Sequence, residues 1–205
     1  IPVNTMTEQI LVKVYKKSKY DGLNADQVIL GMLSFPDHWK NEPMIKVSDE
    51  ILQEQHELEG EYASFAKFFD DNGRYILSQE VDQVYNKKPA MRSTYDKELI
   101  YVDERVNVLM MGFDGSFLRL LPLPDHPLDK WANQREYNRY VRGKSGESPK
   151  PLMDSYLLAV KNAAESGDYS NANSRVQEIS AYQQKEGEKL IPPPFQTRME
   201  VFYNK

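Results

Sequence analysis

The chain has 205 residues, a net charge of -5, no cysteine and a mean hydropathy of -0.67. This composition excludes disulfides, thiol nucleophiles and cysteine-based zinc sites, and it disfavours general nucleic-acid binding, which needs a basic surface. The length suffices for one substantial core or two small ones. No run approaches the roughly 20 apolar residues of a membrane helix. Because the sequence does not begin with Met, we expect a soluble piece of a longer protein.

The first 90 residues predict short helices separated by turns. Thr5 or Thr7 can cap a first helix, and Asn24 can cap a second, because short polar side chains accept hydrogen bonds from the free amides of a first turn. Residues 43–47 predict a short strand or extended segment. Ser48 then predicts the start of an acidic helix.

The longest helical pattern lies at about residues 91–113 and predicts the central core helix. Its apolar residues recur at steps of three and four: Leu99, Val102, Val106, Leu109 and Phe113. The same helix carries Asp103, Glu104 and Arg105, which we expect to form a structural ionic cluster. Adjacent carboxylates point away from each other on a helix, so paired acid–base chemistry is the weaker interpretation.

The last third predicts a helical hairpin. No helix or strand is predicted for the polar stretch up to Gly146, and we place a division near residue 145. Residues 1–145 are then a helical core region, and residues 146–205 are a helical hairpin and C-terminal lead-in, packed on the core as one domain. Two apolar patterns separated by Gly167-Asp-Tyr predict an αα-hairpin that resembles a single tetratricopeptide unit. The fold class is therefore mainly α, an irregular helical domain around a central helix.

Three histidines provide the candidate ligands, and none has a metal-binding spacing, so no metal site is predicted. His38 and His126 lie in predicted loops beside carboxylates and are candidate haem ligands. The alternative is a loop histidine with a local hydrogen bond. No nucleophile elbow, phosphate loop or kinase motif is present, so no catalytic residue is assigned.

Several segments, in order along the chain, resemble one family. They are residues 1–5 (IPVNT), 20–33 (YDGLNADQVILGML), 65–71 (FAKFFDD), 75–78 (YILS), 95–100 (YDKELI), 102–107 (VDERVN) and 115–122 (GSFLRLLP). All are similar to the extracytoplasmic region of fused ResB/CcsA-type membrane proteins for cytochrome c biogenesis, called System II. In that family haem is exported and attached to apocytochrome c.

The resemblance implies a periplasm-facing domain of a multi-pass protein in the inner membrane, with a scaffolding or docking role. The implied partners are the rest of the membrane-embedded assembly protein and apocytochrome c, not nucleic acid. The family's tryptophan-rich haem motif and membrane histidines have no counterpart here. We therefore expect haem ligation to belong to the parent protein, with no cofactor and no enzymatic activity in this domain.

Two alternatives stay open. The domain could contact haem directly through His38 or His126. It could instead be a cytoplasmic helical adaptor with a tetratricopeptide-like hairpin, the family similarity being fortuitous.

Overall fold

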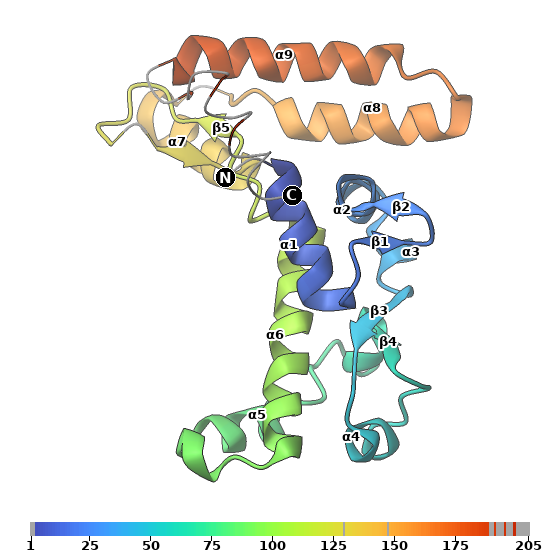
Figure 1. The fold of residues 1–205 in the computed structure, drawn as a ribbon. Helices are drawn as coiled ribbons and strands as arrows, with labels where there is room; N and C mark the ends of the chain where they lie inside the picture. The colour runs from blue at the N-terminus through green and yellow to red at the C-terminus, as the bar shows by residue number, and fades with distance from the viewer. Residues whose placement is uncertain are drawn as a thin grey trace. The chain divides into compact units, whose positions relative to one another are not determined.

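The computed structural model describes residues 3–128, 130–146 and 148–188, with Ile191, Phe195 and Met199. It divides into two compact units, Ile1–Phe113 and Asp114–Lys205 (Figure 1). The described residues form nine α-helices, two 3-10 helices and three two-stranded sheets, so the prediction of a mainly α fold is confirmed. None of the described helices is long and apolar enough to cross a membrane. The predicted division near residue 145, with both parts packed as one domain, stays a prediction.

The first unit is built from six α-helices joined by short strands and turns. The helices are α1 (Val3–Tyr15), α2 (Ala25–Ser34), α3 (Pro36–Trp39), α4 (Glu50–Gln55), α5 (Ser78–Tyr85) and α6 (Thr94–Asp114). The strands are β1 (Lys19–Tyr20), β2 (Leu23–Asn24), β3 (Pro43–Lys46) and β4 (Tyr62–Ser64), and the 3-10 helices are η1 (Phe65–Phe68) and η2 (Pro89–Met91). Strand β1 pairs antiparallel with β2, and β3 pairs antiparallel with β4.

Helix α6 confirms the predicted central helix. Four of its predicted apolar residues are at most 1% exposed: Leu99, Val102, Val106 and Leu109. Phe113 lies half-buried at its end, with its ring centroid 5.1 Å from that of Phe65. The steps of three and four therefore mark the buried side of this helix.

The two predicted threonine caps are wrong, whereas the asparagine cap is confirmed. Helix α1 begins at Val3, which places Thr5 and Thr7 inside it. The Thr7 hydroxyl is turned inward, where Asn4 O lies 2.9 Å away and Oδ1 of Asp26 lies 2.5 Å away. Because neither threonine precedes the first turn, neither can cap its free amides. Asn24 accepts a 3.0 Å bond from the Gln27 amide, as a helix cap does.

The acidic helix α4 is capped by Asp49 rather than by the predicted Ser48. Asp49 Oδ1 accepts a 3.0 Å hydrogen bond from the Leu52 amide. The Ser48 amide instead donates to Glu98 Oε1 at 2.9 Å. Strand β3, just before this turn, confirms the predicted extended segment.

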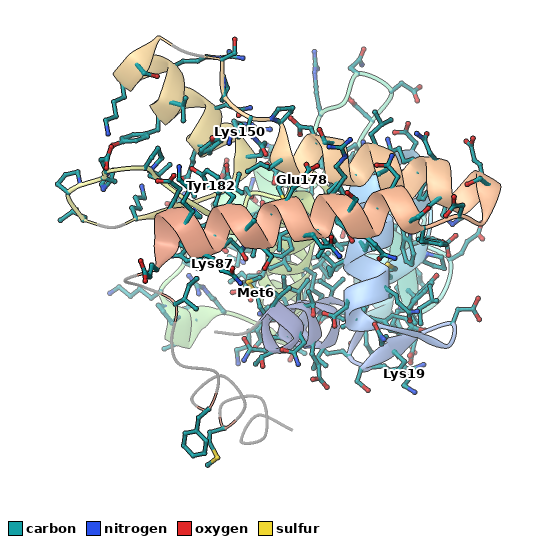
Figure 2. All side chains as sticks on the ribbon, turned by 90° about the horizontal axis from the view of Figure 1, so that it is seen from above. Met6, Lys19, Lys87, Lys150, Glu178 and Tyr182 are labelled. Carbon is teal, nitrogen blue, oxygen red and sulfur yellow. The ribbon has the colours of Figure 1, made fainter. Side chains whose placement is uncertain are left out.

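The second unit contains α7 (Gln134–Ser145), α8 (Leu152–Ser166), α9 (Ser170–Gly187) and the strand pair β5 (Leu121–Pro122) and β6 (Trp131–Ala132). Its core joins residues from β5 and the loop after it, β6 and all three helices: Leu121, Leu123, Ala132, Tyr137, Leu152, Met153, Ile179 and Tyr182. Lys150 extends over this core, with Nζ 5.9 Å from the ring centroid of Tyr182 (Figure 2).

Helices α8 and α9 lie side by side and confirm the predicted hairpin (Figure 1). Gly167 ends α8 in the left-handed conformation, with φ of 77°, which glycine adopts without steric cost. Ala163 and Ala172 are 1% and 4% exposed. Their small side chains let the two helices approach closely. Helix α7, in contrast, occupies the polar stretch for which no element was predicted.

Candidate functional site

Helix α7 presents a strongly basic surface. Asn133 begins the helix by accepting a 2.9 Å bond from the Glu136 amide, and Gly146 ends it with φ of 70°. Tyr137 is 3% exposed and marks the side of the helix that packs against the core. Outside lie arginines at positions 135, 139 and 142, a spacing that keeps side chains within about one helix face. The positive charge stands out in a chain whose net charge is -5.

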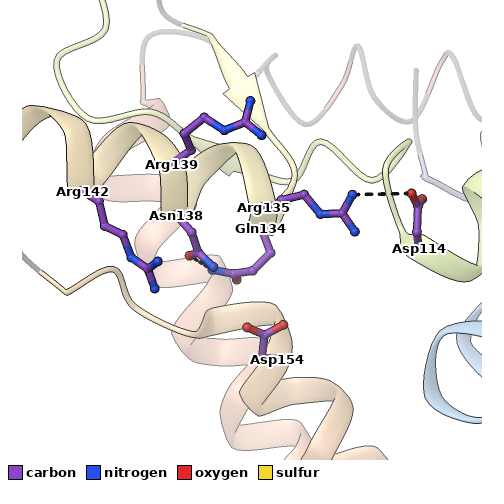
Figure 3. Close-up of a pocket in the computed structure, with 7 residues that line it drawn as sticks. All are labelled: Asp114, Gln134, Arg135, Asn138, Arg139, Arg142 and Asp154. Carbon is purple, nitrogen blue, oxygen red and sulfur yellow. Dashed lines mark hydrogen bonds and ion pairs between the residues drawn. The ribbon is translucent and has the colours of Figure 1, made fainter.

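These arginines line a hollow of about 600 Å³ within the second unit. Its other lining residues are polar: Gln134 and Asn138 on α7, and the two carboxylates Asp114 and Asp154. Figure 3 shows Gln134, Asn138 and Arg142 along the side of α7 that faces Asp154. Arg135 reaches toward Asp114, and Arg139 extends away from Asp154. We call this surface the arginine hollow.

The guanidinium groups of the arginine hollow are weakly engaged. Arg135 Nη1 lies 3.9 Å from Asp114 Oδ2, and the two side chains are 74% and 36% exposed. Arg139 and Arg142 are exposed and form no ion pair with any residue that the structure describes. A surface pair of this kind contributes little stability, so the arginines are available to an external anion.

Gln134 fixes the hollow by joining α7 to the start of α8. Its Nε2 donates to Asn138 Oδ1 at 2.7 Å and to the Lys150 carbonyl at 3.0 Å. Its Oε1 accepts a 2.8 Å bond from the Met153 amide in the first turn of α8. A helix N-terminus carries partial positive charge, which adds to the field of the arginines. The arrangement suits binding of carboxylates, and it provides no nucleophile or proton-transfer pair.

The two candidate haem ligands occupy different surroundings. His38 in α3 has a side chain that is 67% exposed, with Nε2 3.5 Å from Glu42 Oε1 and its ring edge-on to Trp39 at 5.9 Å. His126 accepts a 3.1 Å hydrogen bond at Nδ1 from the Leu128 amide. Its ring lies 5.4 Å from that of Tyr140. His38 therefore lies in a helix and not in the predicted loop, whereas His126 has the local contacts of a loop histidine. The role of both as haem ligands stays a prediction.

The three residues of the predicted ionic cluster in α6 contact different partners. Arg105 is 4% exposed, and its Nη1 donates to Glu98 Oε1 at 3.0 Å and to the Lys46 carbonyl. Glu104 accepts a 2.5 Å bond from Lys13 Nζ. The association of Asp103, Glu104 and Arg105 in a single ionic cluster stays a prediction.

Asp103 is the buried acid of this set, at 8% exposed. Burial raises its pKa above the usual aspartate value, although hydrogen bonds from tyrosine hydroxyls act in the opposite direction. Tyr85 Oη is one such donor, 3.5 Å from Asp103 Oδ2. Among the described residues, no group of three His, Asp or Glu side chains is placed to hold a metal ion.

A second hollow, of about 370 Å³, lies in the first unit. Three tyrosines and two carboxylates line it: Tyr15, Tyr20, Tyr62, Asp21 and Glu42. Sequence reasoning missed both hollows. The arginine spacing in α7 was visible in the sequence, whereas the three tyrosines come from separate segments that only the fold brings together.

The chain is similar to Protein NrfI of Wolinella succinogenes, with 37% identity over all 205 residues. It spans 22% of the length of that protein. No family model matches the chain. The similarity therefore relates the whole chain to one part of NrfI.

Proposed function

We propose that this chain is a docking domain of a larger cytochrome c biogenesis protein of the ResB/CcsA type, on the periplasmic face of the inner membrane. The observation that carries the proposal is the similarity of the complete 205-residue chain to one part of NrfI. The ordered System II segments described above support the same assignment. Haem export and attachment belong, in this proposal, to the rest of the parent protein.

The partner we propose is apocytochrome c, docked on the arginine hollow. Arg139 and Arg142 offer planar guanidinium groups without ion-pair partners among the described residues. Such groups bind carboxylates through two parallel hydrogen bonds, which fixes orientation as well as affinity. Acidic side chains of the partner would therefore contact α7.

A titration of the ¹⁵N-labelled chain with apocytochrome c tests this proposal. We expect saturable chemical-shift changes that are largest at α7 and at the first turn of α8, and that weaken as salt screens the charges. An unchanged spectrum at saturating apocytochrome would contradict the docking role. Chemical-shift changes confined to other surfaces would support a docking role but reject the arginine hollow as the docking site.

Direct haem contact is the second candidate function. His126 uses Nδ1 to accept the Leu128 amide proton, and its Nε2 forms no hydrogen bond within the described residues, so Nε2 is the nitrogen open to a haem iron. A haem titration followed at the Soret band would compare the unmodified chain with His38→Ala and His126→Ala. Saturable binding lost in one variant would support this candidate, and absence of binding would reject it.

A further inference from the structure

The hollow in the first unit is walled by aromatic rings. Tyr15 ends α1, Tyr20 lies in β1 and Tyr62 lies in β4. The Tyr15 ring centroid is 5.0 Å from that of Tyr20 and 4.8 Å from that of Tyr62, with interplanar angles of 64° and 51°. The three rings therefore form one continuous aromatic wall. We call this surface the tyrosine hollow.

Two carboxylates complete the tyrosine hollow. Tyr20 Oη donates a 2.6 Å hydrogen bond to Glu42 Oε2, which fixes the Glu42 side chain at the edge of the rings. Asp21 projects from the tip of the β1–β2 hairpin, where Asp21 and Gly22 have φ of 45° and 79°. Two consecutive positive φ values define a two-residue hairpin turn for which Asp-Gly is well suited. Aromatic faces beside carboxylates form a site for a cation.

A lysine of the chain itself already lies on two of these rings. Lys17 Nζ is 5.1 Å from the Tyr15 ring centroid and 5.6 Å from that of Tyr62. Lys16, with φ of 64°, turns the chain immediately after α1 and so places Lys17 there. Lys17 makes no ion pair with a described residue, so the rings are the contact that holds its ammonium group.

A second lysine near the hollow is engaged elsewhere. Lys46 Nζ lies 5.7 Å from the Tyr62 centroid, and it is also 3.4 Å from Glu61 Oε2. Glu61 therefore shares Lys46 with the ring. Among the described residues, Lys17 contacts only the two tyrosine rings, so it is the lysine that an incoming cation would displace.

We propose that the tyrosine hollow binds the cationic head of a lysine or arginine side chain from a partner protein, with Lys17 as its internal competitor. The partner's cation would replace the Lys17 ammonium group on the rings of Tyr15 and Tyr62. It would also approach the Glu42 carboxylate, with which Lys17 makes no contact. This inference is independent of the docking role proposed for the arginine hollow, because it concerns other residues in the other unit.

The direction in which one mutation changes peptide affinity distinguishes this proposal from a purely structural tyrosine cluster. Lys17→Ala removes the competitor, and we expect it to tighten binding of a capped peptide with a single lysine by about 3-fold, from the usual strength of an exposed cation–π contact. Lys19→Ala is the matched control (Figure 2), because Lys19 is exposed, carries the same charge and forms none of these ring contacts. It should leave the affinity unchanged.

The titration would follow the tyrosine ring signals by NMR, with the same peptide carrying Nε-acetyllysine as the uncharged probe. Glu42→Gln, which keeps the shape of the side chain, should weaken binding of the lysine peptide. The proposal is overturned if the acetylated peptide binds as well as the charged one. It is equally overturned if Lys17→Ala and Lys19→Ala have the same effect.

Discussion

Ser93 and Asp96 bond to each other twice across the start of α6. The Asp96 amide donates to Ser93 Oγ at 3.1 Å, and the Ser93 amide donates to Asp96 Oδ2 at 2.9 Å. The remaining Asp96 oxygen, Oδ1, accepts a 2.7 Å bond from Lys87 Nζ. This reciprocal arrangement is a capping box in which aspartate takes the place of the usual glutamate. It gives the central helix of the first unit a defined beginning.

Replacement of Ser93 by alanine should therefore destabilise the first unit. The variant loses the side-chain acceptor of the Asp96 amide, and removal of a helix cap typically lowers the free energy of unfolding by about 1 kcal/mol. Urea unfolding followed by circular dichroism measures the change. Ser18→Ala is the control, because Ser18 is exposed and has no hydrogen bond within the described residues. Equal stability of the two variants would contradict the capping role.

The same cap predicts a loss of stability in acid. The hydrogen bond from Lys87, followed by that from the Ser93 amide, lowers the pKa of Asp96 below its usual value. A carboxyl group with a lowered folded-state pKa contributes stability above the unfolded-state pKa, about 3.9, and loses it as the pH falls through the folded-state value. The difference in unfolding free energy between the unmodified chain and Asp96→Asn should therefore shrink as the pH falls below about 4. A difference that is constant from pH 7 to pH 3 would contradict this account.

Two glycine-to-alanine substitutions in helices of the first unit should differ in their effect on stability. A Cβ at Gly31 would lie 2.5 Å from Trp39 Nε1 and within 2.8 Å of two more atoms of that buried ring. Overpacking of this kind costs about 1–3 kcal/mol. A Cβ at Gly112 would meet only Met32 Sδ, at 3.6 Å, an ordinary contact. Gly112→Ala should then be neutral or stabilising by up to about 1 kcal/mol, because alanine favours helix. Thermal unfolding of both variants compares their stabilities. Equal stability of the two variants would show that Trp39 moves to accommodate the new Cβ without cost, and it would contradict the prediction.

Tyr182→Phe should destabilise the second unit. The Tyr182 hydroxyl donates a buried 3.0 Å hydrogen bond to the carbonyl of Pro122, and its loss leaves that carbonyl without this donor. The expected cost is about 1–2 kcal/mol in the free energy of unfolding. Tyr169→Phe provides the comparison, because Tyr169 is 52% exposed. Hydrogen exchange of the α9 amides would report the change in this unit, and equal exchange in both variants would count against it.

The sequence predicted the elements whose signals are local. Helix α6 followed from its apolar spacing, the α8–α9 hairpin from the glycine turn at Gly167, and the start of α2 from the Asn24 side chain. The threonine caps failed because the helix begins at Val3, before either threonine. Thr7 instead bonds to Asp26, 19 residues further along the chain, and a pattern within one helix does not contain that partner.

The sites were harder to predict than the helices. Helix α7 is polar overall, with Tyr137 buried and Tyr140 and Val141 packed against the core, so it has few apolar residues to mark it in the sequence. Its cap residues, Asn133 and Gly146, were the signals that could have identified it. The tyrosine hollow depends on Tyr15 and Tyr62, whose rings are 47 positions apart in the chain and meet only because β4 packs beside the end of α1.

The affinity of the chain for apocytochrome c, measured by calorimetry at low salt, tests the docking account most directly. The double variant Arg139→Glu/Arg142→Glu would be compared with Lys161→Glu/Arg175→Glu, which makes the same change in net charge on α8 and α9. The account predicts that the first variant loses at least tenfold in affinity, because two carboxylate contacts of more than about 1 kcal/mol each are replaced by repulsion. It predicts little change in affinity for the second variant. Equal affinities for the two variants would contradict docking on the arginine hollow.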